Sequence, residues 1–288
     1  MRRGEWAESM PIIGIECVGL VVSCPTSEFS PGTPVAALMG GLGRTINGSY
    51  AEYTVAPVSN VVKLADSEEE LELGWDVLAA IPESYCVAWT CLMGNLELRR
   101  GQRVLVRGAT SALGRAAVNL GVEMGVRITA TTRNLEGRAE ELRGLGVEEV
   151  VEEGLGLPQR LDLAYEEKFD AVLDLVGNST LLESLTLVRR GRRLCLAGWL
   201  GGLDPIKDFN PLLQMASGVH FSFFGSFVFG NPGFPLSDVP LQRIVKMVAE
   251  GKFRAEPSRV WKFEQIREAH EVMDANQAGG KMVVLGPS

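Results

Sequence analysis

Hydrophobic positions change their spacing along the chain. Over the first 65 residues, short apolar stretches are separated by glycines and prolines, which is typical of short antiparallel strands. From residue 102 to 198, apolar runs alternate with stretches whose apolar residues recur at helical spacing, which predicts a parallel sheet covered by helices. Strands are expected at 12–22, 35–39, 48–55, 61–64, 104–106, 126–130, 147–151, 169–177, 192–198 and 219–229, and helices at 75–81, 85–96, 115–124, 137–145, 158–165, 180–188, 241–249 and 266–273.

The stretch from Gln102 to Asn134 has the order strand, glycine-containing turn, helix, strand, which is a βαβ unit. Small residues before a helix let an anion approach unpaired backbone N–H groups, so the turn is expected to bind the phosphates of a dinucleotide. The alternative is an ordinary tight turn without a ligand. In the pattern G-x-G-x-x-G, Gly108 and Gly114 are assigned to the first and third positions and Thr110 to the second.

The end of the second strand of this unit indicates which dinucleotide binds. NAD sites tend to place Asp or Glu there, to hold the ribose hydroxyls. This chain has Thr131-Thr132-Arg133-Asn134 and no acid before Glu136. The planar guanidinium of Arg133 suits a 2′-phosphate, although a solvated surface arginine is the alternative. We therefore predict NADP, as NADPH, in preference to NAD.

Composition excludes some function classes. The 288 residues are 46% hydrophobic and 22% charged, with a net charge of −8, which argues against a nucleic-acid partner. The chain has no run of 18 apolar residues, so no membrane span is expected. The N-terminus lacks the apolar core of a signal peptide. Five cysteines form no C-x-x-C pair, so we expect buried thiols in a reducing compartment, the cytoplasm.

Motifs in order along the chain resemble those of medium-chain dehydrogenases/reductases. Gly14–Val21 (GIECVGLV) resembles the G-H-E-x-x-G-x-V signature, and Gly48–Tyr53 resembles the G-x-Y-A-E-Y segment. Ala79–Pro82 and Gly279–Val284 resemble the helix entry and the closing strand. The most similar subgroup is the zinc-free, quinone oxidoreductase-like (enoyl reductase-like) one. The resemblance implies an α/β fold, a doubly wound parallel (Rossmann) sheet with a partial GroES-like β lobe.

The resemblance also implies domain boundaries. The partial β lobe is expected at residues 1–84, the dinucleotide-binding domain at 85–229, and a C-terminal segment returning to the β lobe at 230–288. Relatives carry further strands before the first motif, whereas only 13 residues precede Gly14 here. Either the natural protein is short at this end or the sequence begins late.

Two departures from the family pattern concern metal. The signature histidine, a zinc ligand in related alcohol dehydrogenases, is Ile15 here, and the four closely spaced cysteines of the structural zinc lobe are absent. We therefore expect no metal.

The resemblance carries over cofactor contacts but no catalytic acid. Two of the carried-over positions have equally weighted alternatives: Thr90 as a buried threonine that bonds its own helix, and Lys281 as a solvated lysine. Tyr50 and Glu52 are interpreted as structural. The expected cofactor-binding residues are Thr90, Gly108, Thr110, Ser111, Ala112, Leu113, Thr131, Thr132, Arg133, Asn134, Leu175, Val176, Gly198, Phe224, Gly225, Ser226 and Lys281.

These residues imply an NADPH-dependent, zinc-independent reductase of a conjugated carbonyl, such as a quinone, an enone or a polyketide-type enoyl group. The alternative is a non-redox descendant of the fold, a binding module or an isomerase- or cyclase-like pocket that retains nucleotide binding. In relatives the 219–229 segment pairs with its twin, so a homodimer through this edge strand is expected, the alternative being an internal core strand.

Overall fold

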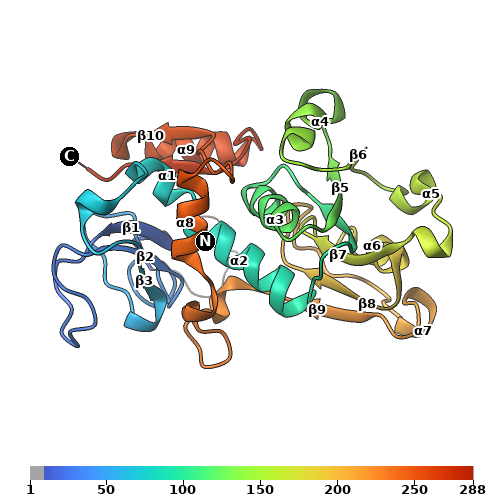
Figure 1. Ribbon diagram of the computed structural model, residues 1–288, viewed down its shortest axis with the longest axis horizontal. Helices are drawn as coiled ribbons and strands as arrows, with labels where there is room; N and C mark the ends of the chain where they lie inside the picture. Colours follow the sequence, from blue (N-terminus) through green and yellow to red (C-terminus); the bar gives the residue numbers. More distant parts are fainter. Residues whose placement is uncertain (1–9, 288) are drawn as a thin grey trace. The chain divides into compact units, whose positions relative to one another are not determined.

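The computed structural model describes residues 10–287 and divides into two compact units (Figure 1). One unit comprises the described residues up to Cys86 together with those from Ser226 onward, and the other is Val87–Gly225. Helix α2 (Pro82–Trp89) runs from the first unit into the second. Pro82 stands at the first position of this helix, where its missing N–H costs no hydrogen bond.

The second unit is built on a six-stranded parallel sheet. Its strand order is β6-β5-β4-β7-β8-β9, so the chain runs outward from β4 in one direction and then returns to β7 on the other side. This order is the doubly wound arrangement, and its switch point lies between β4 and β7. The strands are β4 (Arg103–Arg107), β5 (Arg127–Thr132), β6 (Glu149–Glu152), β7 (Phe169–Asp174), β8 (Val188–Leu196) and β9 (His220–Phe223).

Helices cover both faces of this sheet, because right-handed crossovers that run in opposite directions place their helices on opposite faces. Helix α3 (Ala112–Glu123) packs on β4 and β5, and α4 (Leu135–Gly144) packs on β5 and β6. Helix α6 (Leu181–Leu187) packs on β7 and β8, beside α5 (Leu157–Leu161). A four-residue helix, α7 (Pro211–Gln214), precedes β9.

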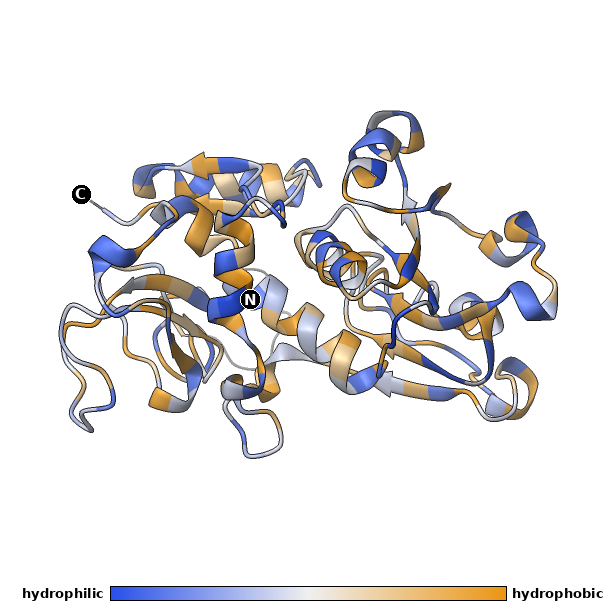
Figure 2. Ribbon diagram, in the orientation of Figure 1, coloured by the Kyte–Doolittle hydropathy of each residue, from blue (hydrophilic) through white to orange (hydrophobic). Residues whose placement is uncertain are grey.

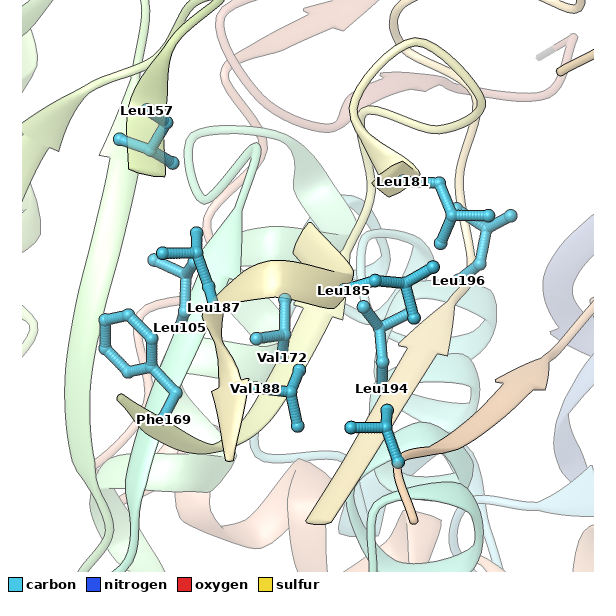
Figure 3. Close-up of a cluster of buried hydrophobic side chains, with 11 residues drawn as sticks. Leu105, Leu157, Phe169, Val172, Leu181, Leu185, Leu187, Val188, Leu194 and Leu196 are labelled. Atoms are coloured by element: carbon cyan, nitrogen blue, oxygen red, sulfur yellow. The ribbon is translucent and has the colours of Figure 1, made fainter. Parts of the chain in front are cut away.

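The core beneath α6 is made of leucine and valine side chains together with Phe169. Leu185 lies against Leu194 of β8, and Leu181 lies beside Leu196 (Figure 3). Helix α4 presents mostly hydrophilic residues and buries only Ala139 and Leu142, so it contributes little to a core (Figure 2). The apolar runs Val104–Val106 of β4 and Ala171–Leu173 of β7 are what a sheet buried on both faces requires.

The first unit contains a small antiparallel sheet and a separate strand pair. Strands β1 (Glu16–Leu20), β2 (Pro34–Leu38) and β3 (Val61–Lys63) pair in that order, and β10 (Arg259–Trp261) pairs with β11 (Met282–Val284) in parallel. Its further helices are α1 (Trp75–Ala79), α8 (Leu241–Ala249) and α9 (Ile266–Asp274). Single 3₁₀ turns across the two units lie at Val58–Asn60, Glu68–Glu70, Tyr165–Glu167, Ser226–Val228, Leu236–Asp238 and Phe263–Gln265.

Two predicted strands are wrong. The segment 48–55 alternates, but it forms no strand: the N–H groups of Gly48 and Tyr50 bond to the carbonyls of Ile12 and Ile13, and Val55 is 80% exposed. The alternating side chains therefore have no core to cover.

The strand expected at 219–229 is also too long. Strand β9 ends at Phe223, and a 3₁₀ turn follows at Ser226–Val228. Its partner β8 ends at Leu196, which pairs with Phe223, so the later aromatic residues have no strand beside them. Among the strands of residues 10–287, β9 lies at the edge of the sheet, so it is not an internal strand there.

No helix within residues 10–287 is long and apolar enough to cross a membrane.

Candidate nucleotide-binding site

The turn after β4 leaves the sheet at its switch point. β4 ends at Arg107, which pairs with Asp174, the last residue of β7. Gly108 then adopts φ +80°, and a Cβ at this position would lie 2.9 Å from Leu200 Cδ1. The left-handed backbone conformation favours glycine at this position. In open α/β sheets, ligands bind outside the carboxyl ends of the strands at this point.

The N-terminus of α3 is capped by Ser111. Its hydroxyl oxygen accepts the Gly114 N–H at 3.0 Å, and the hydroxyl donates to the Gly108 carbonyl at 2.9 Å. The N–H groups of Ala112 and Leu113 find no backbone acceptor within residues 10–287. Unpaired N–H groups at a helix N-terminus form an anion-binding site. The structure thus brings the predicted residues 108–113 together around one such site.

Gly114 corrects the motif assignment made from the sequence. It stands six residues after Gly108, one more than G-x-G-x-x-G allows. A Cβ on Gly114 would lie 2.5 Å from the Gly108 carbonyl oxygen and 2.7 Å from Ala109 Cα. Gly114 therefore serves the purpose of the third glycine, close packing of helix against strand, in a turn that is one residue longer.

At the end of β5, the four predicted residues differ in what their side chains can reach. Thr131 and Thr132 are buried, at 0% and 3% exposure. Asn134 caps α4, because its side-chain oxygen accepts the Gly137 N–H at 2.9 Å. Arg133 is exposed, and its guanidinium has no hydrogen-bond or ion-pair partner within the described residues. Arg133 is thus the side chain at this strand end that is open to a ligand.

The ends of β7, β8 and β9 hold the other predicted contacts in the second unit. Leu175 is 1% exposed, whereas Val176 is half-buried. A Cβ on Gly198 would lie 2.5 Å from the Leu175 carbonyl oxygen, so the chain segments after β7 and β8 touch. Phe224 and Gly225 follow β9, and the Phe224 N–H bonds to the Leu196 carbonyl at 2.9 Å. The buried Leu175 and Phe224 side chains support the strand ends.

Thr90 begins a π-helical segment, Thr90–Asn95, which continues α2. The sequence predicts a single helix over 85–96, and the wider turn is what it misses. π-helical turns often lie at functional sites. Thr90 is half-buried at the start of this segment.

A buried charged network under the turn was missed by the sequence interpretation. Arg107 is fully buried and donates through Nε to Glu153 Oε2 at 3.1 Å, with a second bond from Nη2 to Oε1. Glu153 directly follows β6. The signal available was an arginine at the end of the apolar run of β4, matched by Asp174 at the end of β7. Burial raises the pKa of Asp174, although Ser184, Gly177 and the Arg107 charge oppose the shift.

Lys281 and Ser226 lie in the first unit, and Lys281 is not the solvated lysine of the alternative interpretation. Its amine forms an ion pair with Glu16, and its side chain is 22% exposed. Burial alone would lower the Lys281 pKa, but the charges of Glu16 and Glu83 raise it. Glu16 Oε2 also accepts the Glu83 N–H at 3.0 Å. The Ser226 hydroxyl lies 3.6 Å from Met39 Sδ.

Within the described residues, no group of three or more His, Cys, Asp or Glu side chains could hold a metal ion. The side chain of Ile15, at the position of the family's zinc ligand, has no atom that can coordinate one.

Known proteins resemble this chain over most of its length. A family described as "Zinc-binding dehydrogenase" matches residues 145–284. Human quinone oxidoreductase is 26% identical over 278 residues, which cover 91% of this chain and 81% of the relative. The polyketide synthase GfsB of Streptomyces halstedii is 26% identical over 279 residues, which are 96% of this chain but only 5% of that much longer protein.

A solved mycobacterial structure, described as complexed with NADPH, matches with a TM-score of 0.81 at 22% identity, covering 99% of this chain and 85% of the other. The strand order, the capped helix after β4 and these similarities define an oxidoreductase with a nucleotide-binding fold. The chain resembles the quinone oxidoreductase-like members of the medium-chain dehydrogenase/reductase superfamily.

Proposed function

We propose that this protein is an NADPH-dependent, zinc-independent reductase that transfers hydride to a conjugated carbonyl: a quinone, an enone or a polyketide-type enoyl group. The observation that carries the proposal is the N-terminus of α3. The N–H groups of Ala112 and Leu113 are open there, beside a glycine turn at the switch point of the sheet. A dinucleotide pyrophosphate fits such a site by charge and by geometry.

The residues present also fit the rest of the cofactor. Arg133 offers a free guanidinium where the adenosine ribose is held in this fold, and no acid competes for a 2′-phosphate within the segment Thr131–Asn134. When bound, a reduced nicotinamide supplies the hydride. The chain binds the pyrophosphate through main-chain N–H groups and orients the nucleotide through the strand ends.

The class of substrate is supported by the relatives. Human quinone oxidoreductase and a polyketide synthase both match nearly all of this chain. Quinones and enoyl groups share a carbon–carbon double bond conjugated to a carbonyl, and each is reduced by the addition of one hydride and one proton. Because this chain spans 5% of the synthase, the synthase supports only the chemistry of one of its parts.

Arg133→Ala tests the cofactor assignment. We expect the substitution to weaken NADPH binding by about tenfold to a hundredfold, because one charge-assisted contact to phosphate contributes about 1.5–3 kcal/mol. NADH lacks the 2′-phosphate, so its affinity should change by less than about twofold. Isothermal titration calorimetry with both coenzymes measures the two dissociation constants.

Arg143→Ala is the matched control, because Arg143 is exposed in the last turn of α4. It should leave both affinities unchanged. Equal losses for NADPH and NADH in Arg133→Ala would contradict the assignment. Oxidation of NADPH followed at 340 nm with a panel of quinones and enones tests turnover. Tight NADPH binding without oxidation by any acceptor would favour a non-redox pocket.

A further inference from the structure

Arg107 is a buried charged side chain at the carboxyl end of β4, a central strand of the sheet. It follows the buried residues Val104–Val106 and is itself 0% exposed. A buried guanidinium is tolerated only when its N–H groups are paired. Replacing such a network by apolar groups often costs no stability, so its presence in the sheet calls for a purpose other than stability.

Three contacts connect one side of the guanidinium to the turn after β4. Nε and Nη2 of Arg107 hold both carboxylate oxygens of Glu153. Glu153 Oε2 accepts the hydroxyl proton of Thr131 at 2.5 Å. The same Thr131 oxygen accepts the N–H of Gly108 at 3.0 Å. Because the Thr131 hydroxyl has one proton, which it donates in the hydrogen bond to Glu153, a lone pair of its oxygen is left to accept the Gly108 N–H.

Hydrogen bonds connect the other side of the guanidinium to the turn after β7. Nη1 of Arg107 donates to Ser184 Oγ at 3.1 Å, and Ser184 donates to Asp174 Oδ2 at 2.6 Å. Asp174 Oδ1 accepts the N–H groups of Val176 and Gly177, both at 3.0 Å. One buried cation thus organises the two turns that flank the switch point. Glu183 Oε2, 3.4 Å from Nη2, lies at the outer edge of the network.

We propose that Arg107, Glu153 and Thr131 are positioning residues for the nucleotide. They hold the Gly108 N–H inward, which fixes the turn in the conformation that leaves the N–H groups of Ala112 and Leu113 facing the pyrophosphate. The inference rests on the proposed nucleotide-binding function and names residues that do not touch the ligand. Their effect is on coenzyme affinity, because a turn with several conformations binds only in the competent one.

The test compares Thr131→Val and Glu153→Gln with two matched variants. Thr131→Ser keeps the hydroxyl. Thr129→Val removes a hydroxyl two residues earlier on the same strand, one that donates to Glu149 at 3.3 Å and does not reach the turn. We measure the NADPH dissociation constant, kcat, the KM for NADPH, and the hydrogen exchange of the Gly108 amide in nucleotide-free protein by NMR.

We expect Thr131→Val and Glu153→Gln to raise the NADPH dissociation constant and KM by about tenfold, the loss of roughly one hydrogen bond. At saturating NADPH, kcat should stay within about twofold of the wild-type value. The Gly108 amide should lose protection in both variants. Thr131→Ser and Thr129→Val should bind NADPH like the wild type.

Two results would overturn the proposal. The first is an unchanged NADPH affinity in Thr131→Val although its Gly108 amide has lost protection from hydrogen exchange. The second is an equal loss of NADPH affinity in Thr129→Val, which would mean a general effect on stability. Failure of the proposed function gives a different result, since the wild-type protein would then bind neither NADPH nor NADH. In that case, hydrogen exchange of the Gly108 amide that is as slow in both variants as in the wild type would overturn the positioning network. Faster exchange of this amide in both variants would support it.

Discussion

Single side chains in the first unit form a compact charged cluster. Lys281 pairs with Glu16, and Glu16 in turn accepts the N–H of Glu83 at the start of α2. Burial, followed by the negative charge of Glu16, raises the pKa of Glu83 above its ordinary value of 4.5. Lys281 and the Ser226 hydroxyl oppose that shift but do not cancel it. Two carboxylates share one cation, so one of the two acids holds its proton more tightly than usual.

The raised pKa of Glu83 predicts a pH dependence of stability. Between pH 4.5 and the folded-state pKa, the folded protein keeps a proton that the unfolded chain releases. This stabilisation is complete below pH 4.5 and is lost as the pH rises through the folded-state value. Glu83→Gln needs no proton, so the unfolding free energy of the variant should fall less steeply with rising pH. Urea unfolding across about pH 4.5–8 measures the slope, which is at most about 1.4 kcal/mol per pH unit for one proton.

Glu72→Gln is the control for this experiment, because Glu72 is exposed. Its slope should match that of the wild type. A Glu83→Gln slope equal to the wild-type slope would show that Glu83 titrates normally.

At the scale of elements, the packing of α3 on the turn after β4 depends on Gly114. A Cβ there would meet the Gly108 carbonyl oxygen at 2.5 Å and Ala109 Cα at 2.7 Å, both of them backbone atoms that cannot rotate away. We expect Gly114→Ala to lower the unfolding free energy by about 1–3 kcal/mol, the usual range for overpacking. NADPH binding should weaken as well, because the open N–H groups of α3 would move with the helix. Thermal unfolding and coenzyme titration measure the two effects.

Gly94→Ala is the matched control for stability. Gly94 is also helical and exposed, and its added Cβ would meet only Thr90 Cγ2, at 3.9 Å. Alanine favours helix over glycine, so the variant should be as stable as the wild type or more so. An equal loss of stability in both variants would mean that the close contact at Gly114 does not matter.

The sequence predicts elements well where one residue pattern decides the structure. Leu241–Ala249 is the predicted helix, and the strand after Phe169 begins at the predicted residue, because strict periodicity and long apolar runs leave little choice. The segment 48–55 has an equally regular pattern but finds no sheet to join. Propensity alone cannot reveal such a missing partner.

The residues of the candidate site also form two groups: those that local sequence predicts and those that only the fold brings together. The turn at Gly108 and the exposed Arg133 follow from local sequence, because a glycine turn before a helix and an arginine after a strand are local features. Glu153 lies 46 residues from Arg107 and Lys281 lies 265 residues from Glu16, so only the folded chain brings these charges together. The available signal was an arginine at the end of the apolar run of β4, matched by Asp174 at the end of β7.

At the scale of the whole molecule, β9 is the exposed edge of the six-stranded sheet. Only β8 pairs with it among the described strands, and the side chains of Phe221 and Phe223 are 38% and 48% exposed. An apolar edge strand is an association hazard unless another chain covers it. We propose that β9 of a second copy pairs with it antiparallel across a two-fold axis, which extends the sheet through both protomers.

Phe223→Lys tests this pairing. A lysine on the edge strand discourages strand addition, so the variant should be monomeric at concentrations at which the wild type has twice the monomer mass by light scattering. Leu213→Lys is the control: Leu213 is 79% exposed, but it lies on α7 and not on the edge strand, and this variant should remain dimeric. If the wild type is monomeric up to about 100 μM, well above the concentrations at which specific dimers of micromolar affinity form, the proposed pairing is wrong. A Phe223→Lys dimer would instead place the interface on another surface.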